Sequence, residues 1–358
     1  MIEAAAFAIA FFFAMNIGAS GTAAAMGPAY GSGAIKRKRV AMLLVGACAW
    51  LGALAGGEVV RTIGEGILPP TVMQMEVVVI VLAAACFTLF FANLIGIPLS
   101  TSEVVVGSLV GAGLAYQALY WQYLLVIVSF WIVIPFAAFF LAFGAGKTIK
   151  KYQAHLPFLR GDGKWHKPLT FILIACGCLE AFSAGMNNVA NAVGPLVGVG
   201  ALDVTTAVIA GGFFVALGAL LLGGKVLETN GKHIANLSLL QGSTVSFTGG
   251  ALVIIASIFG LPVPLTQITT AAIVGIGTAE NGFVLWQKSV IRRIIKVWIV
   301  SPLFALAVSY SLILLFRSQD YYTLVVIVSV FIATVGAISL YRSVRQDKEQ
   351  TMRDGEGI

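Results

Sequence analysis

Two segments of this chain are versions of one sequence, and each interrupts an apolar run with small polar residues. The first covers 16–28 and the second 183–195, so that Gly18 and Gly185 correspond at an offset of 167 residues. A duplicated, glycine-rich interruption of apolar helices is typical of the substrate site of a secondary transporter. The duplication therefore predicts two related halves that contribute to one site.

The composition places both halves in a membrane. Hydrophobic residues make up 59% of the 358 positions and charged residues only 10%, whereas a soluble domain carries about a quarter charged residues. Apolar runs recur along the whole sequence, which predicts an all-α polytopic membrane protein. The four cysteines lie inside these runs, and their spacing indicates neither a metal site nor a disulfide framework.

The apolar runs predict the spans of this protein. We expect them near 3–17, 40–56, 74–96, 97–117, 122–145, 168–184, 203–223, 239–260, 261–279, 295–316 and 321–341. The first run lacks the basic region and cleavage site of a signal peptide, so we interpret it as a retained span. The net charge of +7 is concentrated in short loops and in the C-terminal tail. This positive-inside bias predicts an outside N-terminus and a cytoplasmic C-terminus, and it explains the charge without a nucleic-acid partner.

Two further blocks extend the duplication. GGEVVRTIGEGI (56–67) matches GGKVLETNGKHI (223–234), and IPLSTSEVVVGSLVGAG (97–113) matches LPVPLTQITTAAIVGIG (261–277). The first half contains an odd number of predicted spans, so the second half enters the membrane upside down. This pattern predicts an inverted-topology repeat with its site near the bilayer midplane. The predicted organisation is a first repeat (1–146), a basic cytoplasmic linker (147–167), a second repeat (168–316), and an extra transmembrane helix with a cytoplasmic tail (317–358).

Four segments are predicted to break the helices: 16–28, 98–103, 183–195 and 262–267. The runs 97–117 and 261–279 open with proline and hydroxyl residues, which is typical of broken or re-entrant helices. Irregular backbone is tolerated at membrane depth only where protein or a water-filled cavity satisfies it. Helix N-termini at such breaks present N–H groups and a partial positive charge, which suits an anion.

The candidate substrate-binding residues are the polar side chains in these breaks. They are Ser20, Thr22, Ser100, Thr101, Ser102, Asn187, Asn188, Asn191, Thr266 and Gln267. No lysine or arginine lies in the middle of a predicted span, so hydroxyl and amide donors would have to hold an anion. Amides both donate and accept, so polarity alone does not assign the ligand. The alternative role for small and hydroxyl residues is close helix packing.

Two carboxylates lie in apolar surroundings. Glu103 closes the IPLSTSE run, and Glu180 precedes Asn187 in the second repeat. An ionisable group at membrane depth is a functional candidate and often part of a proton relay. We therefore predict proton coupling through one of them. The alternatives are that Glu103 lies at the membrane interface and that Glu180 packs against a polar partner.

At these residues the chain resembles the inorganic phosphate transporter (PiT) family. That family has a GANDVANA signature in each of two inverted halves and a later Pro-x-Ser-Thr-Thr-His run. Here the signatures read GASGTAAA (18–25) and GMNNVANA (185–192), and the later runs read PLSTSE (98–103) and PVPLTQ (262–267). The resemblance covers nearly the whole chain. It implies a homodimeric transporter in which the signature residues serve cation coupling, chiefly by sodium, and the hydroxyl run serves the oxyanion.

The departures from the family pattern indicate the substrate. The family aspartate is replaced by Gly21 and Asn188, and the family histidine by Glu103 and Gln267. Phosphate keeps a proton near neutral pH and can donate to a carboxylate, whereas sulfate only accepts and is repelled by one. A donor-rich site without aspartates therefore favours sulfate. The pattern resembles the sulfate permease branch of the family, a protein of the bacterial plasma membrane.

We predict a proton-coupled importer of sulfate, and of thiosulfate as a further candidate, that works by alternating access. The second hypothesis is an inorganic phosphate symporter driven by sodium or protons. A passive anion channel is a third hypothesis. A membrane enzyme is disfavoured because no metal-ligand cluster and no nucleophile with a nearby base are readable, and no cofactor or metal is expected.

Overall fold

The computed structural model describes residues 1–94, 99–153, 155–156, 163–228, 237–282 and 289–319, together with Tyr322, Val325 and Val326. The chain divides into two units, Met1–Ser309 and Tyr310–Ile358. The first unit contains both predicted repeats almost completely. Most of the predicted last span, 321–341, lies outside the described residues.

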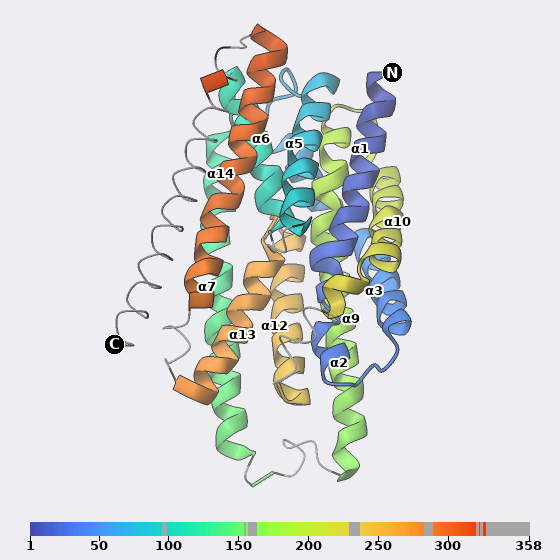
Figure 1. The fold of residues 1–358 in the computed structure, drawn as a ribbon, viewed down its shortest axis with the longest axis vertical. Coiled ribbons are helices and arrows are strands. Elements are labelled where there is room, and N and C mark those ends of the chain that lie inside the picture. Colours follow the sequence, from blue (N-terminus) through green and yellow to red (C-terminus); the bar gives the residue numbers. More distant parts are fainter. Residues whose placement is uncertain are drawn as a thin grey trace, which may run out of the picture. The chain divides into compact units, whose positions relative to one another are not determined.

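The first unit is built from helices (Figure 1). The first half contains α1 (Ile2–Ile17), the π-helical turn η1 (Gly18–Thr22), α2 (Gly27–Gly31), α3 (Lys38–Ala53), α4 (Gly57–Glu65), α5 (Met75–Leu94), α6 (Thr101–Tyr116) and α7 (Trp121–Tyr152). The second half contains η2 (Gly163–Trp165), α9 (His166–Gly198), α10 (Val204–Leu222), α12 (Leu239–Ile258), α13 (Leu265–Asn281) and α14 (Ser289–Ser318). Within the described residues, 7 helices are long and apolar enough to cross a membrane, and the pair α3 and α4 is bent by 66°.

The exposed face of α7 shows why these helices need a lipid environment. Large apolar side chains point outward along its length, among them Leu125, Ile132, Phe136 and Phe140, each more than half exposed. A contiguous apolar surface of this kind is stable against hydrocarbon and unfavourable against water. The apolar runs of the sequence therefore serve both the helix core and the lipid-facing surface.

Reciprocal glycine contacts reveal the inverted repeat in the packing. A Cβ atom on Gly18 would lie 1.9 Å from the carbonyl oxygen of Val215 in α10, and one on Gly185 would lie 1.9 Å from that of Ala49 in α3. Neighbouring contacts repeat this relationship, in the pairs Gly218–Met15 and Gly52–Phe182. The first long helix of each half therefore packs closely against the second long helix of the other half. Small residues permit such close backbone approach between membrane helices.

The helices α6 and α13 are the half-length elements of the two repeats. With 16 and 17 residues, each is shorter than the roughly 20 residues that a membrane span requires. In Figure 1 α6 lies in the upper half of the view and α13 in the lower half. Each packs against a long helix of the opposite half, through Gly107 on Pro302 of α14 and Gly275 on Phe139 of α7.

Three of the four predicted helix breaks occur, and one prediction is wrong. Ser20 has non-helical dihedral angles inside η1, α6 begins only at Thr101, and α13 begins only at Leu265. The segment 183–195, in contrast, is continuous helix within α9, which includes Pro195. The asparagine side chains of this segment bond to α6, to α12 and to the segment before α13 without any opening of the backbone.

Candidate oxyanion site at two helix N-termini

The N-terminal ends of α6 and α13 meet at Glu103 and Gln267. Each residue is the third of its helix, and the side-chain amide of Gln267 donates a hydrogen bond to Oε1 of Glu103. The hydroxyl of Ser301 in α14 donates to Oε2 of the same carboxylate at 2.9 Å. Glu103 is 1% exposed, so its carboxylate is enclosed by other parts of the protein. The two half-length helices are thus joined head to head through a buried carboxylate.

The asparagines of α9 contact the first turn of α6. Thr101 Oγ1 donates to Asn188 Oδ1 at 3.2 Å. The amide nitrogen of Asn191 lies 3.2 Å from Thr101 Oγ1 and 3.1 Å from Ser102 Oγ, while the buried Asn191 Oδ1 has no partner in the described part of the chain. Asn188 and Asn191 therefore face the N-terminus of α6, so the second signature segment (185–192) is in direct contact with the hydroxyl run of α6.

Asn187 links the same hydroxyls to the segment before α13. Its amide nitrogen donates to Ser257 Oγ at 2.8 Å and to the carbonyl oxygen of Leu261 at 2.9 Å. Its Oδ1 accepts from the backbone N–H of Val263 at 3.1 Å and from Ser102 Oγ at 3.5 Å. One side chain of α9 thus fixes the extended segment that precedes α13.

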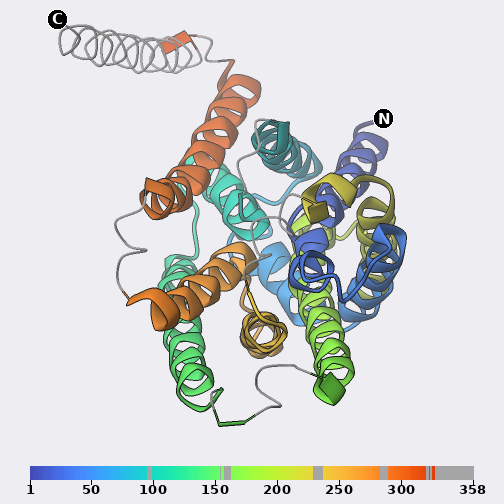
Figure 2. The same ribbon diagram turned by 60° about the horizontal axis from the view of Figure 1, so that its bottom comes forward.

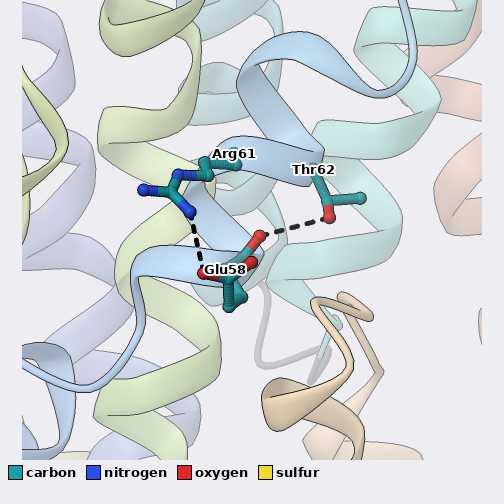
Figure 3. Close-up of polar contacts among 3 residues, drawn as sticks. All are labelled: Glu58, Arg61 and Thr62. Carbon is teal, nitrogen blue, oxygen red and sulfur yellow. Dashed lines mark hydrogen bonds and ion pairs between the residues drawn. The ribbon is translucent and has the colours of Figure 1, made fainter.

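The short helix α4 covers the turn that leads into this segment. Gly260 has a φ of +69°, and a Cβ atom there would lie 2.9 Å from Thr62 Oγ1. Figure 3 shows Thr62 bonded to the carbonyl oxygen of Glu58, whose exposed carboxylate pairs with Arg61 at 2.9 Å. A glycine is needed here because the backbone is left-handed and the α4 residues lie close.

The first repeat reaches the site through its helix break. A Cβ atom on Gly21 would lie 3.7 Å from the side chain of Thr266 at the start of α13, which places η1 beside that helix. The hydroxyl of Ser20, however, donates to the carbonyl oxygen of Ile17 in its own helix. Thr22 Oγ1 is buried without a partner among the described residues. Ser20 and Thr22 therefore lie near the other candidate residues without joining their hydrogen-bonded group.

Glu180 lies in a separate polar cluster on α9. Its Oε1 accepts a hydrogen bond from Thr269 of α13 at 2.7 Å. Seven residues separate Glu180 from Asn187, so both lie on nearly the same face of α9, about 10 Å apart along its axis. Glu180 therefore has a packed polar partner and lies outside the hydrogen-bonded group formed by α6 and the asparagines.

The donors of the site suit an anion. Among the residues whose exposure is described, Glu103 and Glu180 are the buried charged side chains, and the lysines and arginines are at least partly exposed. The N–H group of Glu103 donates to the capping hydroxyl of Ser100 and that of Gln267 to the carbonyl oxygen of Pro264. The earlier N–H groups of both helices have no acceptor within their helices, and both N-termini carry a partial positive charge. Hydroxyls, amides and backbone N–H groups are consequently the donors that this site offers.

Three participating residues were not predicted: Ser257, Ser301 and Thr269. Isolated hydroxyls in apolar runs are usually packing residues, so the sequence pattern did not indicate a role for these three in the site. A signal for Ser301 exists, because Trp-Ile-Val-Ser-Pro (298–302) repeats Trp-Ile-Val-Ile-Pro (131–135). Ser301 is thus the one position at which this further duplicated block differs, with a polar residue in place of Ile134.

Two inverted halves with interlocked helices and paired half-length helices are the architecture of a membrane transporter. The family model of the phosphate transporter family matches residues 17–309. This chain belongs to the phosphate transporter family.

Known relatives agree with this assignment. The protein named sulfate permease CysP of Bacillus subtilis (strain 168) is 50% identical over 358 residues, which cover 100% of both chains. A putative phosphate permease of Helicobacter pylori (strain ATCC 700392 / 26695) is 30% identical, over 74% of this chain and 66% of that protein. A solved structure titled the sodium-dependent phosphate transporter has a TM-score of 0.79 and 26% identity, and the match covers 87% of this chain and 97% of that chain.

Proposed function

We propose that this protein is a secondary active importer of sulfate, with thiosulfate as a second candidate, driven by protons. The observation that supports it is the arrangement around Thr101 and Ser102, where the first turn of α6 faces the amides of α9. An oxyanion in this place would receive hydrogen bonds from hydroxyls, amides and helix N–H groups. It would replace the hydrogen bonds that these groups now make with one another.

The choice of sulfate depends on the missing carboxylates. Gly21 and Asn188 occupy the positions of the family aspartates. Asn188 offers an amide in place of a charge, so a doubly charged anion meets no repulsion there. The full-length relative at 50% identity, named a sulfate permease, supports the same substrate.

Phosphate symport, with sodium or protons, is the second candidate. A specific observation favours it, since the carboxylate of Glu103 is buried beside the α6 hydroxyls. A protonated phosphate could donate to that carboxylate, which sulfate cannot do. A relative named a putative phosphate permease and the solved structure titled the sodium-dependent phosphate transporter support the same candidate.

For the transport cycle we propose alternating access of the two inverted halves around the site. The coupling proton would be carried by Glu103 or Glu180, the buried carboxylates of the described residues. We place the protein in a bacterial plasma membrane with its N-terminus outside, on the support of the basic loops. The homodimer implied by the family resemblance is part of the same proposal.

Uptake by purified protein in liposomes tests this function. Labelled sulfate and labelled phosphate are supplied under an imposed pH gradient, an imposed sodium gradient, or neither. We expect sulfate accumulation with an acidic exterior and no response to sodium. Sodium-dependent phosphate accumulation would establish the second candidate instead. Sulfate flux that ignores both gradients would indicate a passive channel.

A further inference from the structure

The two buried carboxylates differ in their hydrogen bonds. Both oxygens of Glu103 have donors, from Gln267 and Ser301. Oε1 of Glu180 accepts from Thr269, while its buried Oε2 makes no well-formed hydrogen bond among the described residues. An ionised carboxylate needs donors to its buried oxygens. Glu103 is therefore fixed through both of its oxygens, whereas Glu180 keeps one oxygen at which a proton can be bound and released.

The surroundings of the free oxygen contain an acceptor for a proton. Ser246 of α12 lies within hydrogen-bonding reach of Glu180, and its buried hydroxyl makes no well-formed hydrogen bond among the described residues. A protonated Oε2 would donate to Ser246 Oγ and satisfy both groups. The lack of a side chain at Gly250 allows α12 to approach α9 this closely, because a Cβ atom there would lie 3.1 Å from the Cα of Glu180.

Few titratable groups surround Glu180. Cys176, four residues earlier on α9, is the one that interacts with it. The residues that α12 and α13 present to the carboxyl are Ser246, Gly249 and Thr269. The lysines and arginines whose exposure is described are all at least partly exposed, so a charge on Glu180 would have no buried counter-ion among them.

The position of Glu180 suits a carrier between the site and one membrane surface. It lies on α9 between Asn187 and the N-terminal end of that helix, which follows the basic stretch 147–167. Figure 2 shows α12 between α9 and α13, so the cluster lies where three helices meet. The bond to Thr269 joins α9 to α13, and Thr269 follows Gln267 by two residues. A change at Glu180 is thereby transmitted to the helix whose N-terminus forms the site.

We infer that Glu180 is the proton carrier and that Glu103 is a positioning residue, which deepens and rests on the proposed function. Glu180 takes a proton from hydronium on the outside-facing route and holds it as the hydroxyl of a carboxylic acid bonded to Ser246. It releases that proton to water on the side of the basic stretch. Glu103 takes no part in the proton exchange and holds α6, α13 and α14 together.

Matched variants test the assignment in the liposome assay. We compare Glu180→Gln, Glu103→Gln and the exposed control Glu65→Gln for accumulation driven by a pH gradient and for sulfate–sulfate exchange. The expected result is that Glu180→Gln loses accumulation and keeps exchange that no longer depends on pH. Glu103→Gln should reduce both activities together, and the control should match the wild type. Gradient-driven accumulation by Glu180→Gln would overturn the inference while leaving the proposed function intact.

A spectroscopic measurement covers the case in which Glu180→Gln loses both activities. Infrared difference spectra between acid and alkaline pH report the carbonyl stretch of protonated carboxylic acids. We expect a titrating band that Glu180→Gln removes, Ser246→Ala shifts, and Glu103→Gln leaves in place. A band that disappears only in Glu103→Gln would assign the proton to Glu103. A wild type without gradient-driven accumulation would reject proton coupling itself, and this inference with it.

Discussion

Gln267 donates its side-chain hydrogen bond to Glu103, and the two residues are counterparts in the duplicated blocks, at an offset of 164. Two equivalent positions can touch only close to the axis that relates the halves. The contact therefore locates the pseudo-symmetry axis between the N-termini of α6 and α13. At this point the sequence is asymmetric, with a carboxylate from one half and an amide from the other.

The asymmetry of this pair is testable by exchange. Gln267→Glu would place two carboxylates against each other in a buried position and should lower the thermal unfolding temperature. The double variant Glu103→Gln with Gln267→Glu restores one carboxylate and one amide, so we expect a favourable coupling energy of about 1–3 kcal/mol between the two changes. Unfolding of the four proteins in detergent measures it. Strictly additive effects would show that the contact does not govern stability.

Asn188 should control the choice of anion. Asn188→Asp keeps the oxygen that accepts from Thr101 but adds a negative charge. We expect the affinity for sulfate to fall roughly tenfold or more, since like charges at a binding site cost several kcal/mol, while competition by phosphate increases. Labelled sulfate uptake with unlabelled phosphate as competitor measures both effects. The neutral variant Asn188→Ala separates loss of the amide from gain of the charge, and equal behaviour of the two variants would contradict the argument.

The interlocked glycines should tolerate no side chain. Gly185→Ala places a methyl group against the carbonyl oxygen of Ala49 and should destabilise the protein by about 1–3 kcal/mol, as overpacking does. Gly18→Ala should behave alike. The matched control is Gly144→Ala in α7, where nothing lies within 4 Å, and alanine there should stabilise the helix by about 1 kcal/mol. The thermal unfolding temperatures of the three variants test this prediction. An unchanged unfolding temperature for Gly185→Ala would contradict the close packing of Gly185 on α3.

Asp203 gives a pH-dependent contribution to stability outside the spans. Its carboxylate accepts from the hydroxyl and the backbone N–H of Thr206, which lowers the pKa of Asp203 below its ordinary value of 3.8. The stabilisation is complete above that value and is lost as the pH falls through the lower pKa of the folded state. Asp203→Ala should therefore unfold at a lower temperature than wild type at neutral pH, with the difference shrinking in acid. A difference that is constant with pH would assign the effect to something other than the charge.

The half-length helices could be predicted from the sequence because proline and hydroxyl residues open both runs, and these residues are favoured where a helix begins. The same reasoning failed at 183–195, where glycine and asparagine suggested a break. A row of small polar residues fits either an interrupted helix or an intact one whose amides bond to its neighbours. The partners that decide between these, Ser257 and the backbone of Leu261 and Val263, come from a distant part of the chain. Their proximity to Asn187 follows from tertiary packing, which no local pattern records.

The close packing of Gly18 against α10 and of Gly185 against α3 has a consequence for biosynthesis. When the ribosome has completed only the N-terminal half, α1 and α3 lack the helices against which they finally rest. These early segments must therefore remain in the bilayer as separately inserted helices until α9 and α10 emerge from the ribosome. Native assembly is therefore a late event in translation, and a nascent chain truncated before α9 should remain unassembled.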